Sequence, residues 1–191
     1  MNTVFFDLET MGLSRNRDSI LEIAAIVVDE NNHIIDGAVY NTFINPQKKI
    51  PFPITQLTGI SDVDVRNAPT EFIAIKGFVD FLKKYNVQVI AGHNIVRFDI
   101  PFIKERAAQW NIDLNLPQTV IDTLAIAKEK HKAGLLPGYN YTTDKGNLSF
   151  KLEWLMDYYN IGSQDHRAIN DVRHNIEVYR ELTSKEEDYG F

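Results

Sequence analysis

The chain has 191 residues, of which 44% are hydrophobic and 24% charged, as is typical of a single folded domain with its own core. Its net charge of −6 argues against a broad basic surface for nucleic acid, although two bound divalent cations would offset four of those charges. There is no cysteine, no long apolar run and no signal-peptide pattern, which excludes disulfides and thiolate metal sites and predicts a cytoplasmic protein without a membrane segment.

The N-terminal part of the chain predicts three strands. Their residues are rich in Val, Ile, Phe and Ala, and a turn signal, Asn31-Asn32, separates the second strand from the third. The predicted strands span residues 3–7, 20–29 and 34–44, and a loop with Pro46, Pro51 and Pro53 follows.

The rest of the chain predicts alternating helices and strands. Apolar residues recur at three- and four-residue steps, the period of a helix with one buried face. Helices are predicted over 69–82, 100–110, 124–131, 149–159 (capped by Ser149) and 168–182, short strands over 87–91 and 119–121, and a long loop over 134–147. We expect a mixed α/β sheet covered by helices, in one domain over residues 1–183, with a charged, frayed tail over 184–191.

Asp7 and Glu9 lie where the first predicted strand runs out. The period of two residues in a strand places both carboxylates on the same face. Two close carboxylates repel each other unless a cation lies between them, and Mg²⁺ or Mn²⁺ prefers such oxygen ligands. Taken alone, the pair is more simply explained as a solvated acidic turn.

Two further groups of residues carry similar chemistry. Asp99 follows His93-Asn94 and enters a helix, where an aspartate often serves as the N-cap. His166 precedes the last helix, and Asp171 lies in its first turn, where the helix dipole favours a negative charge. Histidine titrates near neutrality and can act as a general base. Taken alone, these residues are equally a helix cap, an exposed loop residue and a helix-stabilising charge.

Together the three groups resemble the exonuclease motifs of the DEDDh, or DnaQ-like, superfamily of 3′–5′ exonucleases. The resemblance covers nearly the whole chain and is greatest to the proofreading, epsilon-type exonucleases of bacterial DNA polymerase III. The matching residues are Phe6-Asp7-Leu8-Glu9-Thr10, His93-Asn94 with Phe98-Asp99, and His166-x-Ala168-x-x-Asp171, together with 20–25, 43–46, 57–60 and 68–69. Met11 departs from the family, which often has Thr there, and residues 132–147 form a longer segment than in compact members.

This resemblance implies a ribonuclease H-like fold with a central mixed sheet of about five strands. It implies hydrolysis of nucleotides from the 3′ end of DNA, preferably at single-stranded or unpaired ends, to nucleoside 5′-monophosphates. Two divalent cations, Mg²⁺ or Mn²⁺, would take part. Asp7, Glu9 and Asp171 would hold one metal, and Asp7 and Asp99 the other. His166 would deprotonate the attacking water.

The resemblance also implies substrate contacts and partners. Thr10, Leu13, Asn94 and Phe98 match family positions near the terminal nucleotide, where apolar side chains can contact a base. For Leu13 and Phe98 the alternative is simple core packing. The implied partners are 3′ ends of DNA, with RNA as an alternative, and a polymerase or another replication or repair protein.

Three other functions stay open at this point. The chain could be an exoribonuclease or oligonucleotide trimmer on the same fold. It could be an aspartyl-phosphate phosphatase, which also has an acid-x-acid pair after its first strand, although that chemistry usually uses an aspartate where this chain has Glu9. It could also be a catalytically silent nucleic-acid-binding module, which would have no need of a complete set of metal ligands.

Overall fold

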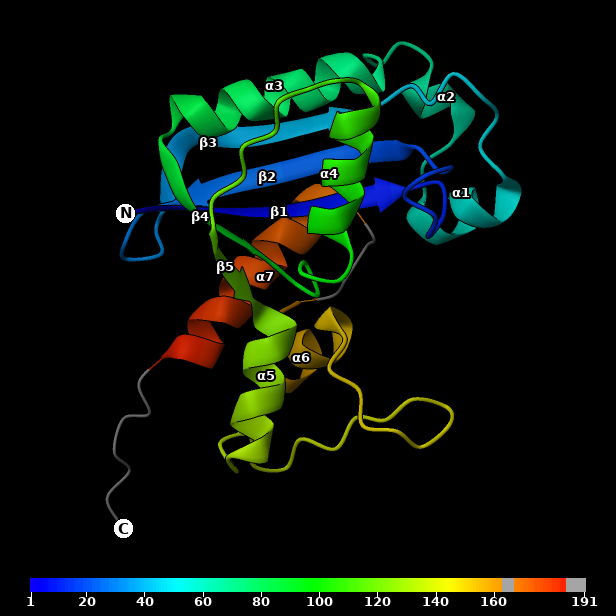
Figure 1. Ribbon diagram of the computed structural model, residues 1–191. Coiled ribbons are helices and arrows are strands. Elements are labelled where there is room, and N and C mark those ends of the chain that lie inside the picture. Colours follow the sequence, from blue (N-terminus) through cyan, green and yellow to red (C-terminus); the bar gives the residue numbers. More distant parts are fainter. Residues whose placement is uncertain (163–166, 185–191) are drawn as a thin grey trace.

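A five-stranded mixed sheet lies at the centre of the computed structural model, which describes residues 1–162 and 167–184 (Figure 1). The strand order is β3-β2-β1-β4-β5, in which β1 pairs antiparallel with β2 and parallel with β4. All five predicted strands are confirmed, and so is the mixed sheet. The strands are β1 (Asn2–Thr10), β2 (Ile20–Val28), β3 (Ile34–Phe43), β4 (Val87–Gly92) and β5 (Thr119–Asp122).

Helices cover both faces of this sheet. Figure 1 shows α3 and α4 on one face and α7 on the other, with α5 and α6 beside α7. The helices are α1 (Phe52–Thr58), α2 (Asp62–Val65), α3 (Glu71–Lys84), α4 (Asp99–Gln109), α5 (Thr123–Lys132), α6 (Leu152–Tyr158) and α7 (Ala168–Thr183). The predicted boundaries of α3, α4, α5 and α7 differ from the observed ones by no more than two residues. No helix in the described parts of the chain is long and apolar enough to cross a membrane.

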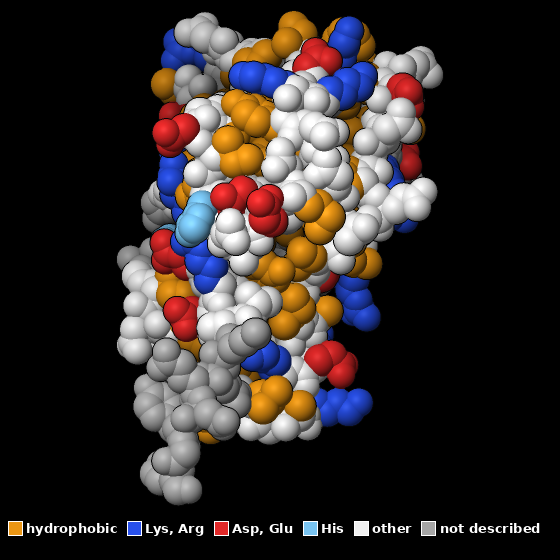
Figure 2. All heavy atoms as spheres, turned by 90° about the vertical axis from the view of Figure 1, so that its left-hand side faces the viewer, with side chains coloured by type: hydrophobic (Ala, Val, Ile, Leu, Met, Phe, Trp, Pro, Cys, Tyr) orange, Lys and Arg blue, Asp and Glu red, His pale blue; other side chains and the backbone are white. Residues whose placement is uncertain are grey.

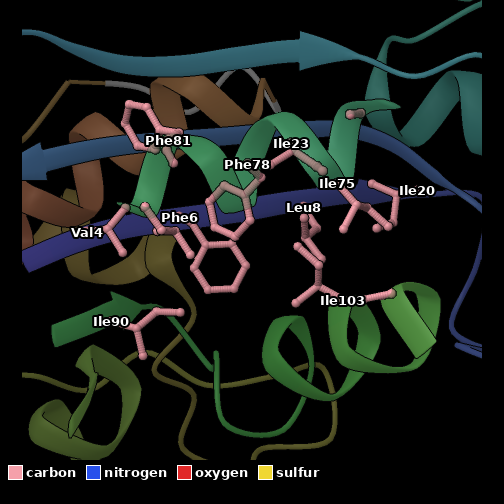
Figure 3. Close-up of a cluster of buried hydrophobic side chains, with 14 of the residues drawn as sticks. Val4, Phe6, Leu8, Ile20, Ile23, Ile75, Phe78, Phe81, Ile90 and Ile103 are labelled. Carbon is pink, nitrogen blue, oxygen red and sulfur yellow. The ribbon is translucent and has the colours of Figure 1, made fainter. Parts of the chain in front are cut away.

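The largest core cluster lies between the sheet and the α3–α4 layer (Figure 3). Phe6 and Leu8 of β1 point into it, and the ring of Phe6 lies 5.5 Å from that of Phe78 on α3. Buried aromatic side chains of this size contribute strongly to stability. This cluster therefore fixes which face of β1 is turned toward α3.

The alternation of side chains along β1 then determines what faces α7. Phe5 lies on that side, with its ring 5.4 Å from the ring of Tyr179. Asp7 and Glu9 are two and four residues further along the same face. The apolar residues of β1 thus direct both carboxylates toward the layer that contains α7.

The loop predicted after β3 was wrong in part, because it contains two short helices. Pro51 is the N-cap of α1 and Pro53 lies in its first turn, where the missing N–H of proline needs no partner. A capping box formed by Ser61 and Asp64 starts α2. The prolines therefore begin a helix here instead of only ending a strand.

The start predicted for α6 was also wrong. Lys151, not Ser149, is its N-cap. The backbone of Ser149 is held elsewhere, because its N–H donates to the Tyr141 carbonyl at 2.8 Å and its carbonyl accepts from the Tyr139 hydroxyl at 2.7 Å. Because of these tertiary hydrogen bonds, the helix begins only at Leu152.

The long loop predicted over 134–147 has no helix, but it contributes to a core of its own. Tyr139 is only 5% exposed and its ring stacks on that of Phe150 with centroids 5.0 Å apart. Of the tail predicted over 184–191, only Ser184 lies within the described residues, directly after α7.

Candidate active site

Three carboxylates converge where β1 ends beside the first turn of α7. Asp7 and Glu9 come from β1 and Asp171 from α7, and one ligand atom of each lies within 4.8 Å of the others. Asp171 thus meets two residues that lie more than 160 positions earlier in the sequence. Asp7 and Glu9 lie together because side chains two residues apart in a strand share a face.

These carboxylates are electrostatically strained in the metal-free protein. Burial and the charges of Asp99, Glu9 and Asp171 raise the pKa of Asp7 well above its usual range. Burial, followed by the charges of Asp171 and Glu22, raises the pKa of Glu9 to about 8. Desolvation and like charges both disfavour an ionised carboxylate. A cation between these groups would relieve both effects.

Asp99 approaches the cluster from the start of α4. The N-cap of that helix is Phe98, so the capping explanation of Asp99 is wrong. Its carboxylate instead accepts a hydrogen bond from the Leu8 N–H at 3.2 Å, which ties it to β1 between Asp7 and Glu9. Burial raises the pKa of Asp99 to about 7. The fourth predicted carboxylate is therefore next to Asp7, although outside the three-ligand group.

The donor set fits divalent cations of the hard type. All four groups are carboxylates, and Mg²⁺ and Mn²⁺ prefer oxygen ligands, often with water and phosphate completing the shell. Burial and repulsion between the acids raise their pKa values, and for Glu9 these effects outweigh the lowering by Arg167. The residues present therefore match the predicted cofactor by chemistry.

The predicted base, His166, lies outside the described residues. Its neighbour Arg167 is described and is anchored at the site: its guanidinium donates to Glu22 at 3.1 Å and lies 4.7 Å from the centre of the Phe43 ring. Glu22 is fully buried and pairs with Glu9 across β1 and β2. Sequence reasoning missed this pair, although Glu22 is the only charged residue in the nine-residue strand β2.

A second residue that sequence reasoning missed is Asp122, at the end of β5. Its carboxylate accepts hydrogen bonds from the N–H groups of Asn94 at 3.0 Å, Val96 at 3.2 Å and Leu124 at 3.0 Å. It thereby caps α5 and holds the turn between β4 and α4. The sequence feature that could have identified Asp122 is its place between a predicted strand and a predicted helix.

The predicted substrate residues do not share one groove. Leu13 and Phe98 line one groove, with a volume of about 290 Å³. Leu13 is 85% exposed, so core packing does not explain it, whereas Phe98 is half-buried and packs against Phe102. Thr10 is buried, and its hydroxyl donates to the Gly12 carbonyl at 2.8 Å.

Asn94 lines a different depression. This second groove has a volume of about 330 Å³ and also contains His93 and Lys128. Burial lowers the pKa of His93 to about 4, and its Nδ1 lies 3.0 Å from the Thr123 hydroxyl. His93 is therefore a neutral structural residue near pH 7.

Comparisons with known proteins find similar sequences and a similar fold. A family model described as Exonuclease (RNase T) matches residues 4–179. The PolC-type DNA polymerase III of Caldanaerobacter subterraneus subsp. tengcongensis is 32% identical over 188 residues, which cover 98% of this chain and 12% of that protein. The DNA polymerase III epsilon subunit of Rickettsia felis is 29% identical over 187 residues, 96% of this chain and 74% of that protein.

A solved structure of similar fold is the zinc-bound complex of E. coli exonuclease I with single-stranded DNA. It superposes with a TM-score of 0.79 at 22% identity and covers 97% of this chain. This chain corresponds to 41% of that protein and to only 12% of the PolC-type relative.

Proposed function

The chain belongs to this exonuclease family and is an exonuclease hydrolase with a ribonuclease H-like fold, and on that premise we propose that it removes nucleotides from the 3′ end of DNA. Single-stranded or unpaired ends are the proposed substrates, and nucleoside 5′-monophosphates the products. The observation that carries the proposal is the convergence of Asp7, Glu9 and Asp171 beside the buried Asp99.

The proposed roles are those that the family resemblance implies, and the convergence of these carboxylates supports them. Asp7, Glu9 and Asp171 would hold one divalent cation, and Asp7 and Asp99 a second. When bound, Mg²⁺ or Mn²⁺ would stabilise charge on the attacking and leaving oxygens of the phosphodiester. The tie from Asp99 to the Leu8 N–H fixes the spacing between α4 and β1.

His166 is the proposed general base. It directly precedes Arg167, the N-cap residue of α7, whose guanidinium pairs with the buried Glu22. A base must be held within hydrogen-bond reach of the water that it deprotonates. This anchoring of the adjacent residue supports the assignment of His166 to that role.

Leu13 and Phe98 are proposed to contact the terminal nucleotide. An 85% exposed leucine beside a half-buried phenylalanine offers apolar surface to a base of any identity. Thr10, at the end of β1, and Asn94, in the second groove, are proposed contacts at the edges of this site. Partnership with a polymerase, as the names of the relatives suggest, and a cytoplasmic location are part of the proposal.

We expect the purified protein to shorten 5′-labelled single-stranded DNA when Mg²⁺ or Mn²⁺ is added and to stop when EDTA removes the metal. Denaturing gel electrophoresis of time courses on single-stranded DNA, duplex DNA with a mismatched 3′ end, RNA and dinucleotides would measure the preference. Faster loss of RNA or dinucleotides would favour the exoribonuclease or trimmer. Release of inorganic phosphate with unchanged oligonucleotide length would instead indicate a phosphatase.

Replacing His166 by alanine is expected to lower kcat roughly 10²–10⁴-fold, the usual loss when a general base is removed. Metal binding should persist, because the four carboxylates are unchanged. Single-turnover kinetics and isothermal titration with Mn²⁺ would measure the two quantities. His131→Ala is a matched control, since His131 lies in α5 against the rings of Tyr139 and Phe150. Full activity of the His166 variant would show that another group is the base.

A further inference from the structure

Two arginines line the same groove as Leu13 and Phe98. Arg15 comes from the loop between β1 and β2, and Arg97 from the turn before α4. Both are exposed, and neither forms an ion pair with a carboxylate of the described residues. In a protein with a net charge of −6, two uncompensated guanidinium groups on one groove are a local concentration of positive charge.

The loop that carries Arg15 is held in place by hydrogen bonds. The Ser14 N–H donates to the Asp18 carboxylate at 2.8 Å, and the side chain of Gln109 on α4 donates to the Asn16 carbonyl at 3.3 Å. Binding then costs less ordering of the loop, because the backbone around Arg15 is already positioned.

The turn that carries Arg97 is held equally well. Asn94 adopts a positive φ of 61°, and its carbonyl accepts from the N–H of Arg97 at 3.1 Å. The carboxylate of Asp122 fixes the same turn through Asn94 and Val96. Both arginines therefore extend from hydrogen-bonded backbone segments that line the groove.

The groove lies close to the carboxylate cluster. Arg97 is two residues before Asp99, so their Cα atoms are at most about 7 Å apart. The four acids disfavour the approach of a polyanion, while the arginines offer a phosphate a charge-assisted, bidentate contact. A phosphate near the scissile one is thus the ligand that matches the position and charge of both side chains.

We propose that Arg15 and Arg97 bind an internucleotide phosphate adjacent to the scissile linkage, so that the enzyme selects a continuing strand over a single nucleotide ester. This inference rests on the proposed nuclease function. It deepens that function by assigning two binding residues and a substrate preference: a strand with at least one phosphate besides the one that is cleaved.

The test compares two substrates of the intact protein. One is a 5′-labelled single-stranded oligonucleotide, and the other is the p-nitrophenyl ester of thymidine 5′-monophosphate, which contains only the scissile phosphate. For Arg15→Ala/Arg97→Ala, the ratio of kcat/KM on the oligonucleotide to that on the ester should fall on the order of 10–100-fold, mainly through KM. The slope of log affinity against log salt concentration should become shallower by roughly 0.7, the value for one lost phosphate contact on a single strand.

The control is Lys83→Ala/Lys84→Ala, which removes the same charge from the C-terminal end of α3. This helix end directly precedes β4, at the end of the sheet opposite the carboxylates. Figure 2 views that end, where basic side chains lie among acidic and apolar ones. The substrate ratio of this control should stay within about twofold of the wild type, since it tests only the effect of net charge.

Four outcomes separate the possibilities. A wild type that cleaves neither substrate contradicts the proposed function itself. A double arginine variant whose loss is equal on both substrates overturns the phosphate contact, and so does a control with the same change in ratio. A neutral methylphosphonate at one linkage beside the scissile one should slow the wild type but not the double variant, and equal slowing of both would also overturn the inference.

Discussion

Replacing Asp7 by asparagine is expected to reduce DNA hydrolysis by more than about a thousandfold while stabilising the metal-free protein. Both proposed cations lose a charged ligand, and the electrostatic stabilisation of the reaction depends on those cations. At the same time, the variant removes a buried negative charge that repels Glu9, Asp99 and Asp171. Activity assays in Mg²⁺ and thermal unfolding in EDTA would measure the two opposite effects.

The stability of the metal-free protein should depend on pH because of the same repulsion among the acids. The pKa of Glu9 is raised to about 8 and that of Asp99 to about 7, both above the values of an unfolded chain. Between about pH 4.5 and 8 the folded state therefore binds more protons than the unfolded state, and stability falls as pH rises. This decline should be shallower in the Asp7→Asn variant.

Asp144→Asn is a suitable control, because Asp144 is exposed in the long loop and far in sequence from the cluster. It should change neither activity nor the pH slope of stability. If Asp7→Asn made the metal-free protein less stable near pH 7, repulsion among the acids would not be the dominant local effect. If the variant kept its activity, Asp7 would not be a shared metal ligand.

Replacing Glu71 by alanine is expected to destabilise the protein by about 3–5 kcal/mol, the usual cost of removing one partner of a buried ion pair. Glu71 is only 4% exposed. Its carboxylate accepts hydrogen bonds from the guanidinium of Arg106, the indole of Trp110 at 2.8 Å and the Ile20 N–H at 3.0 Å. All three donors lose a buried acceptor in the variant.

Urea denaturation monitored by circular dichroism would measure this loss. Glu71→Gln should be destabilised less, because it keeps an acceptor for some of the donors. Glu153→Ala is the control, since Glu153 pairs with the exposed Lys151 and such surface pairs contribute little. A loss below about 1 kcal/mol for Glu71→Ala would mean that Arg106 finds other partners or water.

Glu71 also links stability to the active site. It joins the starts of β2 and α3 to Arg106 on α4, the helix whose first residue is Asp99. Loss of these contacts should shift α4 relative to β1. The Leu8–Asp99 hydrogen bond, which connects the two elements, should then weaken. Activity of the Glu71 variants is therefore expected to fall at temperatures below their unfolding transition.

The sequence predicted most elements because the relevant signals are local. Strand-forming residues mark β1 to β3, and a helical period marks α3 and α7, so most of their bounds differ little from those predicted, although β1 runs three residues beyond its predicted end at residue 7. The errors lie where a local signal was overridden or ambiguous. Prolines that end a strand can also begin a helix, as at α1, and tertiary hydrogen bonds to the backbone of Ser149 move the start of α6.

By itself, the sequence determined that Asp7 and Glu9 share a face of β1 and that the ordered motifs belong to one exonuclease family. Only the tertiary structure decided how these acids meet Asp171 and Asp99, that Leu13 is exposed, and that Arg15 and Arg97 line one groove. The physical reason is the distance along the sequence over which each effect acts. Strand period and helix propensity act over a few residues, whereas burial, repulsion and pairing depend on which distant segments the packed core brings together.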